Sequence, residues 1–132
     1  MQWLGDNHMS RIIKPNFEHK DQRGVLREVV RGKQWKQLNE YERKKGSIVG
    51  NHYHKKLEEF FYIIRGKAQV RIENITTGKT EDFIVSAGEA FNVSINEVHA
   101  LKFLEGTIFI PILSKDFDEN NPDIYDKVIL DG

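Results

Sequence analysis

Several residue types and patterns are missing from this 132-residue chain, and each absence excludes a class of protein. There is no cysteine, which excludes a disulfide framework, a thiolate metal site and a cysteine nucleophile. The 20 Lys and Arg residues are balanced by 20 Asp and Glu residues. The chain therefore lacks the basic excess typical of nucleic-acid binding, and we expect no nucleic-acid partner. No apolar run reaches the roughly 20 residues that span a bilayer, so we expect no membrane partner.

The length and these absences together predict a single domain in a reducing compartment. A chain of this size can bury a core without disulfides or a structural metal. The first ten residues, MQWLGDNHMS, lack the basic and apolar regions of a secretory signal. We therefore expect a cytoplasmic protein in which residues 1–10 form a tail and residues 11–132 form the folded domain.

The chain does contain a strong alternation of apolar and polar residues with period two, which indicates β-strands. The clearest stretch has Ala68, Val70 and Ile72 on one face and Gln69, Arg71 and Glu73 on the other. Turn sequences such as Asp21-Gln22-Arg23-Gly24 recur about every 8 to 12 residues, which predicts an all-β barrel or sandwich of roughly ten strands. Pro111 falls inside a late strand and predicts an edge or a bulge there.

The residues with the most distinctive chemistry lie around two histidines in the middle of the chain. His52 and His54 are one residue apart, so in a strand both imidazoles project from the same face. The next carboxylates along the chain belong to Glu58 and Glu59, and the alternation of side chains along a strand does not show which of them faces the histidines. With His99 from a distant strand, these residues form a nitrogen and oxygen set that suits Zn, Fe(II), Mn, Ni or Cu(II). The alternative is that the two histidines lie in a polar surface loop.

The spacing of these residues resembles the first motif of the cupin superfamily, G(x)5HxH(x)4E(x)6G. Its five positions correspond to Gly46, His52, His54, Glu59 and Gly66, which selects Glu59 over Glu58. The second cupin motif, G(x)5PxG(x)2H(x)3N, matches in part. Gly88 and His99 fit it, whereas Ser94, Asn96 and Phe103 stand at its Pro, Gly and Asn positions.

This resemblance implies an all-β cupin fold, a double-stranded β-helix or jelly-roll barrel. It also implies a divalent metal ion held by the two paired histidines, the carboxylate and the distant histidine. Zinc is the favoured ion, with iron, manganese and nickel as alternatives. The expected ligands are His52, His54, Glu59 and His99. Asn96 tolerates left-handed backbone better than most residues and can still make the turn of the second motif.

Other stretches resemble cupins that act on nucleotide-linked sugars. GNHYH at 50–54 and FDENNPDIY at 117–125 are similar to the cupin domain of capsular-polysaccharide UDP-sugar epimerase/reductases, which join a reductase domain to a cupin, whereas we expect a stand-alone cupin here. Residues 21–24 with Glu28 resemble the D-x-R-G-x-x-x-E element of deoxysugar epimerases. The resemblance implies 3-epimerisation of a nucleotide-linked 4-keto-6-deoxy sugar in surface-polysaccharide synthesis. It also implies that Arg23 contacts the diphosphate, often across a dimer interface.

Other functions and other proton carriers remain open. Related keto-sugar isomerases use two histidines as acid and base without metal, but usually have a Gln where this chain has Glu59. Another metal cupin, such as an oxygenase or small-molecule isomerase, or a non-catalytic sugar-binding cupin, would share the barrel.

A histidine bound to metal cannot also remove a proton from the substrate. The remaining candidates for the proton carrier are Tyr41, Tyr53, Tyr62 and Lys102. Because successive side chains of a strand point to opposite faces, Tyr53 and Lys102 face away from the neighbouring histidines. We therefore select Tyr41 as the catalytic residue. Because open sheets leave edges to cover, we expect a homodimer.

Overall fold

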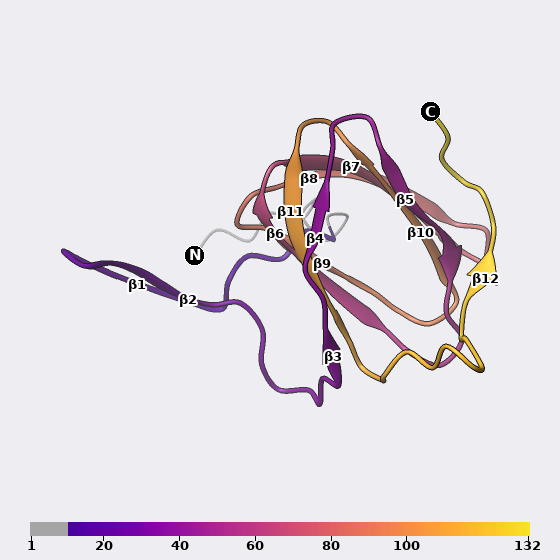
Figure 1. The fold of residues 1–132 in the computed structure, drawn as a ribbon, viewed down its shortest axis with the longest axis horizontal. Coiled ribbons are helices and arrows are strands. Elements are labelled where there is room, and N and C mark those ends of the chain that lie inside the picture. The colour runs from indigo at the N-terminus through magenta and orange to yellow at the C-terminus, as the bar shows by residue number, and fades with distance from the viewer. Residues whose placement is uncertain (1–10) are drawn as a thin grey trace.

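The computed structural model describes residues 11–132, so the predicted tail at residues 1–10 lies outside the described part of the chain. The described residues form twelve strands and no helix, and hence no helix that could cross a membrane. Ten of the strands form two five-stranded sheets, and the first two form a separate hairpin. Figure 1 shows the two sheets closing into a barrel and the hairpin projecting from it. The prediction of an all-β barrel is confirmed.

The first six strands comprise the two strands of the hairpin and the first four strands of the barrel. They are β1 (Phe17–Asp21), β2 (Gly24–Glu28), β3 (Gln37–Leu38), β4 (Tyr41–Arg43), β5 (Ile48–Tyr53) and β6 (Glu59–Arg65). The second half contains β7 (Lys67–Asn74), β8 (Thr80–Ser86), β9 (Ala90–Val93), β10 (Glu97–Phe103), β11 (Thr107–Leu113) and β12 (Tyr125–Asp126).

Two antiparallel sheets face each other across the core. One has the strand order β12-β5-β10-β7-β8, and the other has the order β3-β11-β6-β9, with β4 also paired to β11. Inward-facing residues of both sheets fill the space between them, as alternation along a strand requires. The core contains Phe61, Ile63, Ala68, Val70, Ile72, Val85, Phe91, Val93, Leu101, Phe103 and Phe109.

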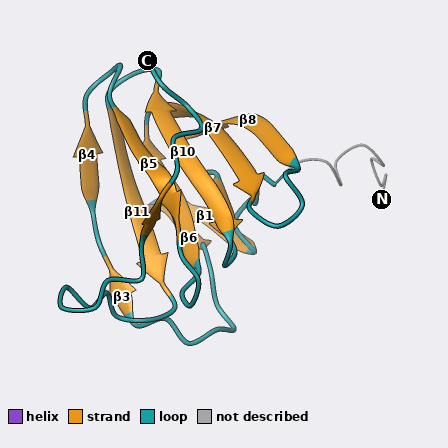
Figure 2. Cartoon of the chain, turned by 90° about the vertical axis from the view of Figure 1, so that its right-hand side faces the viewer, coloured by secondary structure: helices purple, strands orange, loops and turns teal. Residues whose placement is uncertain are grey.

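Pro111 does not lie at an edge, contrary to the sequence prediction, because β11 is paired on both sides. It pairs with β6 along its length, and its bulge falls between Ile108 and Phe109. On its other side β3 and β4 follow one another along β11, as Figure 2 shows. Pro111 faces the interval between them, where its carbonyl accepts a hydrogen bond from the Asn39 amide at 3.0 Å. The missing proline N–H therefore falls where the ladder is already interrupted.

The β1–β2 hairpin turns at Gln22 and Arg23, as the sequence predicts, with Asp21 paired to Gly24. It forms a two-stranded sheet of its own, joined to the barrel only by loops. Three of its apolar side chains, Phe17, Val25 and Leu26, are exposed. The hairpin therefore presents an apolar surface that residues 11–132 leave exposed.

Candidate metal centre

A bulge in β5 determines how His52 meets His99. His52 is paired with His99, but Gly50 is paired with Ala100, so Asn51 is an extra residue in the strand. Asn51 takes a left-handed conformation with φ 57°. Gly50 has φ 95°, and a Cβ there would lie 2.4 Å from the His99 carbonyl oxygen. Only glycine fits this position, so the Gly-Asn pair fixes the part of the strand that carries the histidines.

The structure brings together the four side chains expected to bind metal. Each offers one ligand atom, and these atoms all lie within 4.8 Å of one another. The ring centroid of His99 lies 4.8 Å from that of His52 and 5.6 Å from that of His54. Glu58 instead points outward and pairs with Lys33 at 2.5 Å, so Glu59 is the carboxylate of the cluster. Three of the four, His54, Glu59 and His99, are buried, and His52 is partly buried.

The local environment sets different protonation states within the cluster. Burial lowers the pKa of His52 to about 4, and the neighbouring histidines add to this. Burial alone would raise the pKa of Glu59, but His54 at 2.8 Å and His99 at 3.4 Å lower it to about 2. Burial works against the charged form of His54, but the Glu59 carboxylate outweighs it and the pKa of His54 is raised. The cluster therefore holds an ionised carboxylate and a neutral His52, both ready to bind a cation.

These donors fit a divalent transition metal. Three imidazoles and one carboxylate are the ligand types that such ions prefer, and a cation would balance the buried carboxylate. His54 would release its Nε2 proton on binding, because a histidine ligand must be neutral there. The cluster could therefore hold one metal ion with every donor supplied by this chain.

Asp123 fixes the orientation of His54, and the sequence analysis gave it no role. Its backbone carbonyl accepts a hydrogen bond from His54 Nδ1 at 2.6 Å, which turns Nε2 toward Glu59. Its carboxylate accepts hydrogen bonds from the amides of residues 55, 56 and 57 at 2.8, 2.8 and 3.1 Å. The FDENNPDIY stretch contains Asp123, and its resemblance to the cupin domain of capsular-polysaccharide enzymes was the one sequence signal that pointed to this region.

Tyr41 lies beside the cluster. It lines a cavity of about 60 Å³ whose wall consists of Tyr41, Val49, Gly50, His52, Glu59, Phe61, His99, Leu101, Phe109 and Pro111. The centroid of its ring lies 5.1 Å from that of Phe109 and 4.6 Å from the Arg43 guanidinium. The other proton carriers considered, Tyr53, Tyr62 and Lys102, do not line this cavity, and Tyr53 stacks on Tyr125 instead.

Arg23 lies far from the cluster within one chain. It is at the tip of the projecting hairpin, where it pairs with Asp21 at 2.6 Å. The loop of the second motif lies closer: Asn96 has φ 63°, and its amide donates to the His54 carbonyl at 2.7 Å. Asparagine therefore makes the turn at the Gly position of that motif, as expected.

Comparison with known proteins identifies the family and the fold of the chain. A family model described as the polysaccharide biosynthesis C-terminal domain matches residues 19–125. A search among curated proteins gave no match. Solved structures with a similar fold include the capsular polysaccharide assembling protein CapF from Staphylococcus aureus, at 23% identity and a TM-score of 0.67. That match covers 86% of this chain but 34% of CapF, so the chain spans about a third of that protein.

Two further structures match over more of their length. The dTDP-6-deoxy-D-glucose-3,5-epimerase RmlC from Legionella pneumophila matches at 18% identity and a TM-score of 0.76, covering 91% of this chain and 73% of that one. The 3'-monoepimerase ChmJ from Streptomyces bikiniensis matches at 18% identity and a TM-score of 0.75, covering 87% and 67%. The chain thus belongs to the polysaccharide biosynthesis C-terminal domain family and has the cupin fold found in deoxysugar epimerases.

Proposed function

We propose that this chain is a metal-dependent epimerase or isomerase of a nucleotide-linked 4-keto-6-deoxy sugar, acting in the cytoplasm in surface-polysaccharide synthesis. The observation that carries the proposal is that Tyr41 shares one cavity with His52, Glu59 and His99. Two similar structures support the substrate class. The Legionella pneumophila epimerase was solved with dTDP-4-keto-L-rhamnose, and the Streptomyces bikiniensis enzyme with dTDP-quinovose.

Epimerisation at carbon 3 requires a proton to leave the carbon next to the 4-keto group and to return on the other face. His52, His54, Glu59 and His99 would hold the metal, with zinc favoured over iron, manganese or nickel. A bound ion would polarise the keto oxygen as a Lewis acid. Because the histidines are then occupied as ligands, Tyr41 is the proton carrier that the cavity offers.

The size of the cavity bears on how the sugar binds. A space of about 60 Å³ holds an ion and a few water molecules, which is too little for a hexose ring. The reacting edge of the sugar would therefore enter, and the rest would lie at the mouth of the cavity. A nucleotide sugar then needs further binding groups beyond those that line this cavity.

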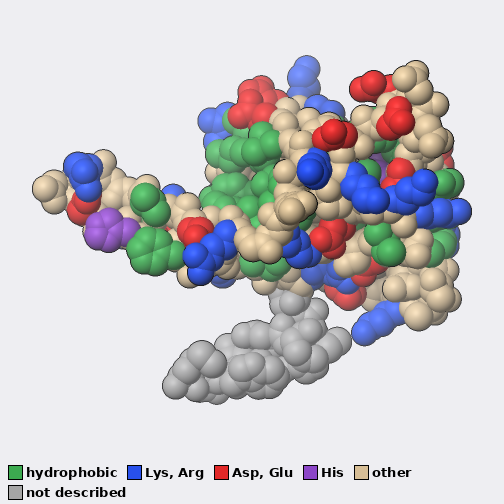
Figure 3. Space-filling model, turned by 90° about the horizontal axis from the view of Figure 1, so that it is seen from below, with side chains coloured by type: hydrophobic (Ala, Val, Ile, Leu, Met, Phe, Trp, Pro, Cys, Tyr) green, Lys and Arg blue, Asp and Glu red, His purple; other side chains and the backbone are tan. Residues whose placement is uncertain are grey.

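We propose that a second copy of the chain supplies some of these groups. An isolated two-stranded hairpin is at best marginally stable, so β1 and β2 need a surface to pack on. The outer face of the β3-β11-β6-β9 sheet offers one, because Leu38, Tyr62, Ile64, Ile110 and Ile112 leave apolar surface exposed or half-buried there. Figure 3 shows hydrophobic side chains gathered on the flank of the barrel beside the hairpin.

In such a homodimer each hairpin would pack against the other copy and carry Arg23 with it. A guanidinium makes bidentate contacts with phosphate oxygens, so Arg23 of the partner subunit is our candidate for the diphosphate. This role requires Arg23 to exchange its present partner, Asp21, for the ligand.

Solvent exchange tests the reaction directly. The enzyme is incubated in D2O with UDP- or dTDP-linked 4-keto-6-deoxy sugars, and deuterium at carbon 3 is followed by NMR. We expect incorporation by the wild-type protein and a loss of about 100-fold or more in Tyr41→Phe, the range typical of a general acid or base. Tyr62→Phe is the matched control, because Tyr62 faces away from the cavity.

Three results would count against the proposal in different ways. No exchange with any of these sugars would reject the epimerase. Equal rates in Tyr41→Phe and wild type would reject Tyr41 as the proton carrier. Oxygen consumption by a protein that holds iron, without exchange, would favour the oxygenase alternative.

A further inference from the structure

Two arginines have no carboxylate partner among residues 11–132, whereas the other five do. The chain has seven arginines, all among the described residues. Five form ion pairs with Asp or Glu: Arg11, Arg23, Arg27, Arg31 and Arg71. The remaining two, Arg43 and Arg65, form no ion pair within the part of the chain that the structure describes. An unpaired guanidinium is common at a surface, but both of these line the same pocket.

The pocket lies where β11 begins. Thr107 of β11 is paired with Arg43 of β4 on one side, and Ile108 is paired with Arg65 of β6 on the other. Paired strands lie about 4.8 Å apart, so the two arginines flank β11 from both sides. The pocket has a volume of about 290 Å³ and is lined by Glu42, Arg43, Lys44, Arg65, Gly106, Thr107 and Ile108. The lining of the pocket therefore contains three cationic side chains and one carboxylate.

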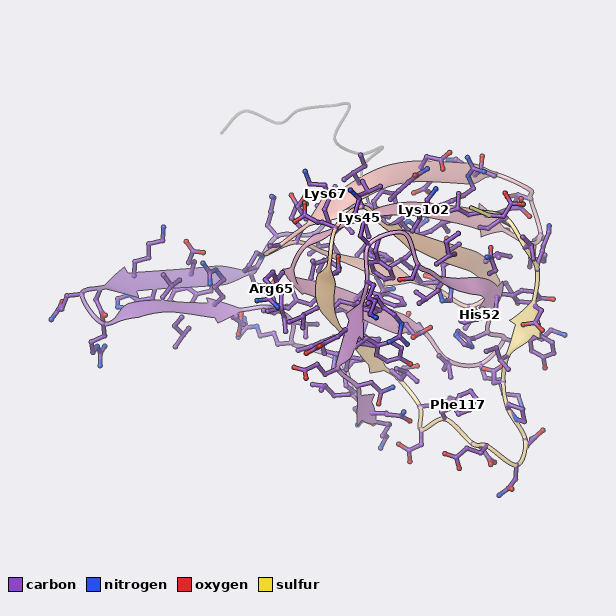
Figure 4. The ribbon with its side chains drawn as sticks, turned by 45° about the horizontal axis from the view of Figure 1, so that its top comes forward. Lys45, His52, Arg65, Lys67, Lys102 and Phe117 are labelled. Carbon is purple, nitrogen blue, oxygen red and sulfur yellow. The ribbon has the colours of Figure 1, made fainter. Side chains whose placement is uncertain are left out.

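The surroundings of the pocket add to its positive charge. Lys45, Lys67 and Lys102 form no ion pair among the described residues, and Glu105 in the β10–β11 turn offsets part of their charge. Figure 4 shows the three lysines near one another at one end of the barrel. A chain of net charge +0 thus gathers unpaired cations at one place.

We propose that this pocket binds a phosphate or diphosphate group through Arg43, Arg65 and Lys44. Guanidinium groups match phosphate oxygens in bidentate contacts, and a lysine adds a point charge. Gly106 leaves the backbone accessible to the ligand, because nothing lies within 4 Å of the position that a Cβ would take. This binding does not depend on the proposed reaction.

The pocket also has a physical connection to the candidate metal centre. The Arg43 guanidinium lies 4.6 Å from the centroid of the Tyr41 ring, and Tyr41 lines the cavity of the cluster. A phosphate that draws Arg43 toward itself changes this contact. The phosphate has two possible sources: the nucleotide sugar whose sugar enters the cavity, or a separate phosphate compound.

Calorimetric titration of the full chain with inorganic pyrophosphate, at constant ionic strength, tests the pocket. We expect Arg65→Gln and Arg43→Gln each to weaken pyrophosphate binding at least tenfold. Lys79→Gln should bind as wild type, because Lys79 lies in the β7–β8 loop and likewise has no ion pair among the described residues. His99→Ala should also bind as wild type, which excludes pyrophosphate held by a metal ion. Thermal melts of each variant check that it is folded.

A second titration, with UDP, identifies the source of the phosphate. If UDP displaces pyrophosphate and Arg65→Gln weakens the binding of both, the pocket holds the diphosphate of the nucleotide sugar, in place of Arg23 of the partner subunit. Binding of UDP without displacement assigns it to a separate phosphate compound. The proposal is overturned if pyrophosphate fails to bind at millimolar concentration, binds both arginine variants as tightly as wild type, or is lost in His99→Ala. None of these outcomes bears on deuterium exchange, so the two proposals fail independently.

Discussion

At the scale of single residues, the cluster depends on side chains whose protonation is set by contacts rather than by residue type. A single residue, Tyr53, separates His52 from His54 in the sequence, yet the pKa of His52 is lowered and that of His54 is raised. The difference arises because His54 meets the Glu59 carboxylate and the Asp123 carbonyl, whereas burial dominates at His52. The order of residues alone does not reveal this asymmetry.

The lowered pKa of His52 predicts how the stability of the metal-free protein depends on pH. Below the ordinary pKa of 6.5 the unfolded chain protonates His52, whereas the folded chain does so only near 4. Stability should therefore fall as pH decreases from 6.5 to 4, by up to about 3 kcal/mol. The raised pKa of His54 contributes fully below 6.5 and is lost only as pH rises, so it does not oppose this trend.

Urea unfolding of chelator-treated protein between pH 4 and 6.5 measures this dependence. His52→Gln should flatten the decrease, and His19→Gln, at an exposed hairpin histidine, should leave it unchanged. An equally steep decrease in His52→Gln would show that other groups are responsible.

At the scale of elements, the bulge in β5 requires a glycine. In Gly50→Ala the new methyl group would meet the His99 carbonyl at 2.4 Å, at a φ that L residues rarely adopt. We expect a loss of more than about 2 kcal/mol in the free energy of unfolding, together with weaker metal binding. Gly78→Ala is the matched control, since Gly78 also has positive φ but open space around its Cβ position. That variant should lose only about 1 kcal/mol, and equal losses in the two would contradict the close approach.

The segment that follows β11 acts on the cluster through Asp123. In Asp123→Ala the three amides of residues 55–57 lose their acceptor, and the carbonyl that orients His54 is no longer held. We expect zinc affinity to fall about 10- to 100-fold, as for other groups that orient metal ligands. Asp118→Ala, in the same segment, removes an exposed carboxylate that bonds only the nearby amide of Asn120. An unchanged zinc affinity in Asp123→Ala would leave Asp123 without a role in orienting His54.

The sequence predicted local features better than long-range contacts. Alternation of apolar residues indicated the barrel, and the motif spacing selected Glu59 over Glu58, which the structure places in separate environments. The sequence could not predict the bulge at Asn51, nor that the strand containing Pro111 is paired on both sides. Each feature depends on which strand lies alongside. The contact between Asp123 and His54 was missed for the same reason, because 69 residues separate Asp123 from the side chain that it orients.

At the scale of the whole molecule, the uncovered hairpin predicts association. Leu26 is 58% exposed on β2, and we expect Leu26→Asp to convert a dimer into a monomer in light scattering coupled to size exclusion. Ile84→Asp is the control, because Ile84 is 52% exposed on β8 of the other sheet. A monomeric wild-type protein would reject the dimer, and with it the contribution of Arg23 from a partner subunit.

The most direct test of the central claim is the metal content of the purified protein, loaded with zinc and freed of excess. His52→Ala removes one ligand from the cluster, and His19→Ala removes a histidine from the hairpin tip region without touching the cluster. We predict about one equivalent of zinc in the wild-type protein and in His19→Ala, and loss of stoichiometric zinc in His52→Ala. A wild-type protein that retains no metal, or a His52→Ala variant that retains a full equivalent, would contradict the account.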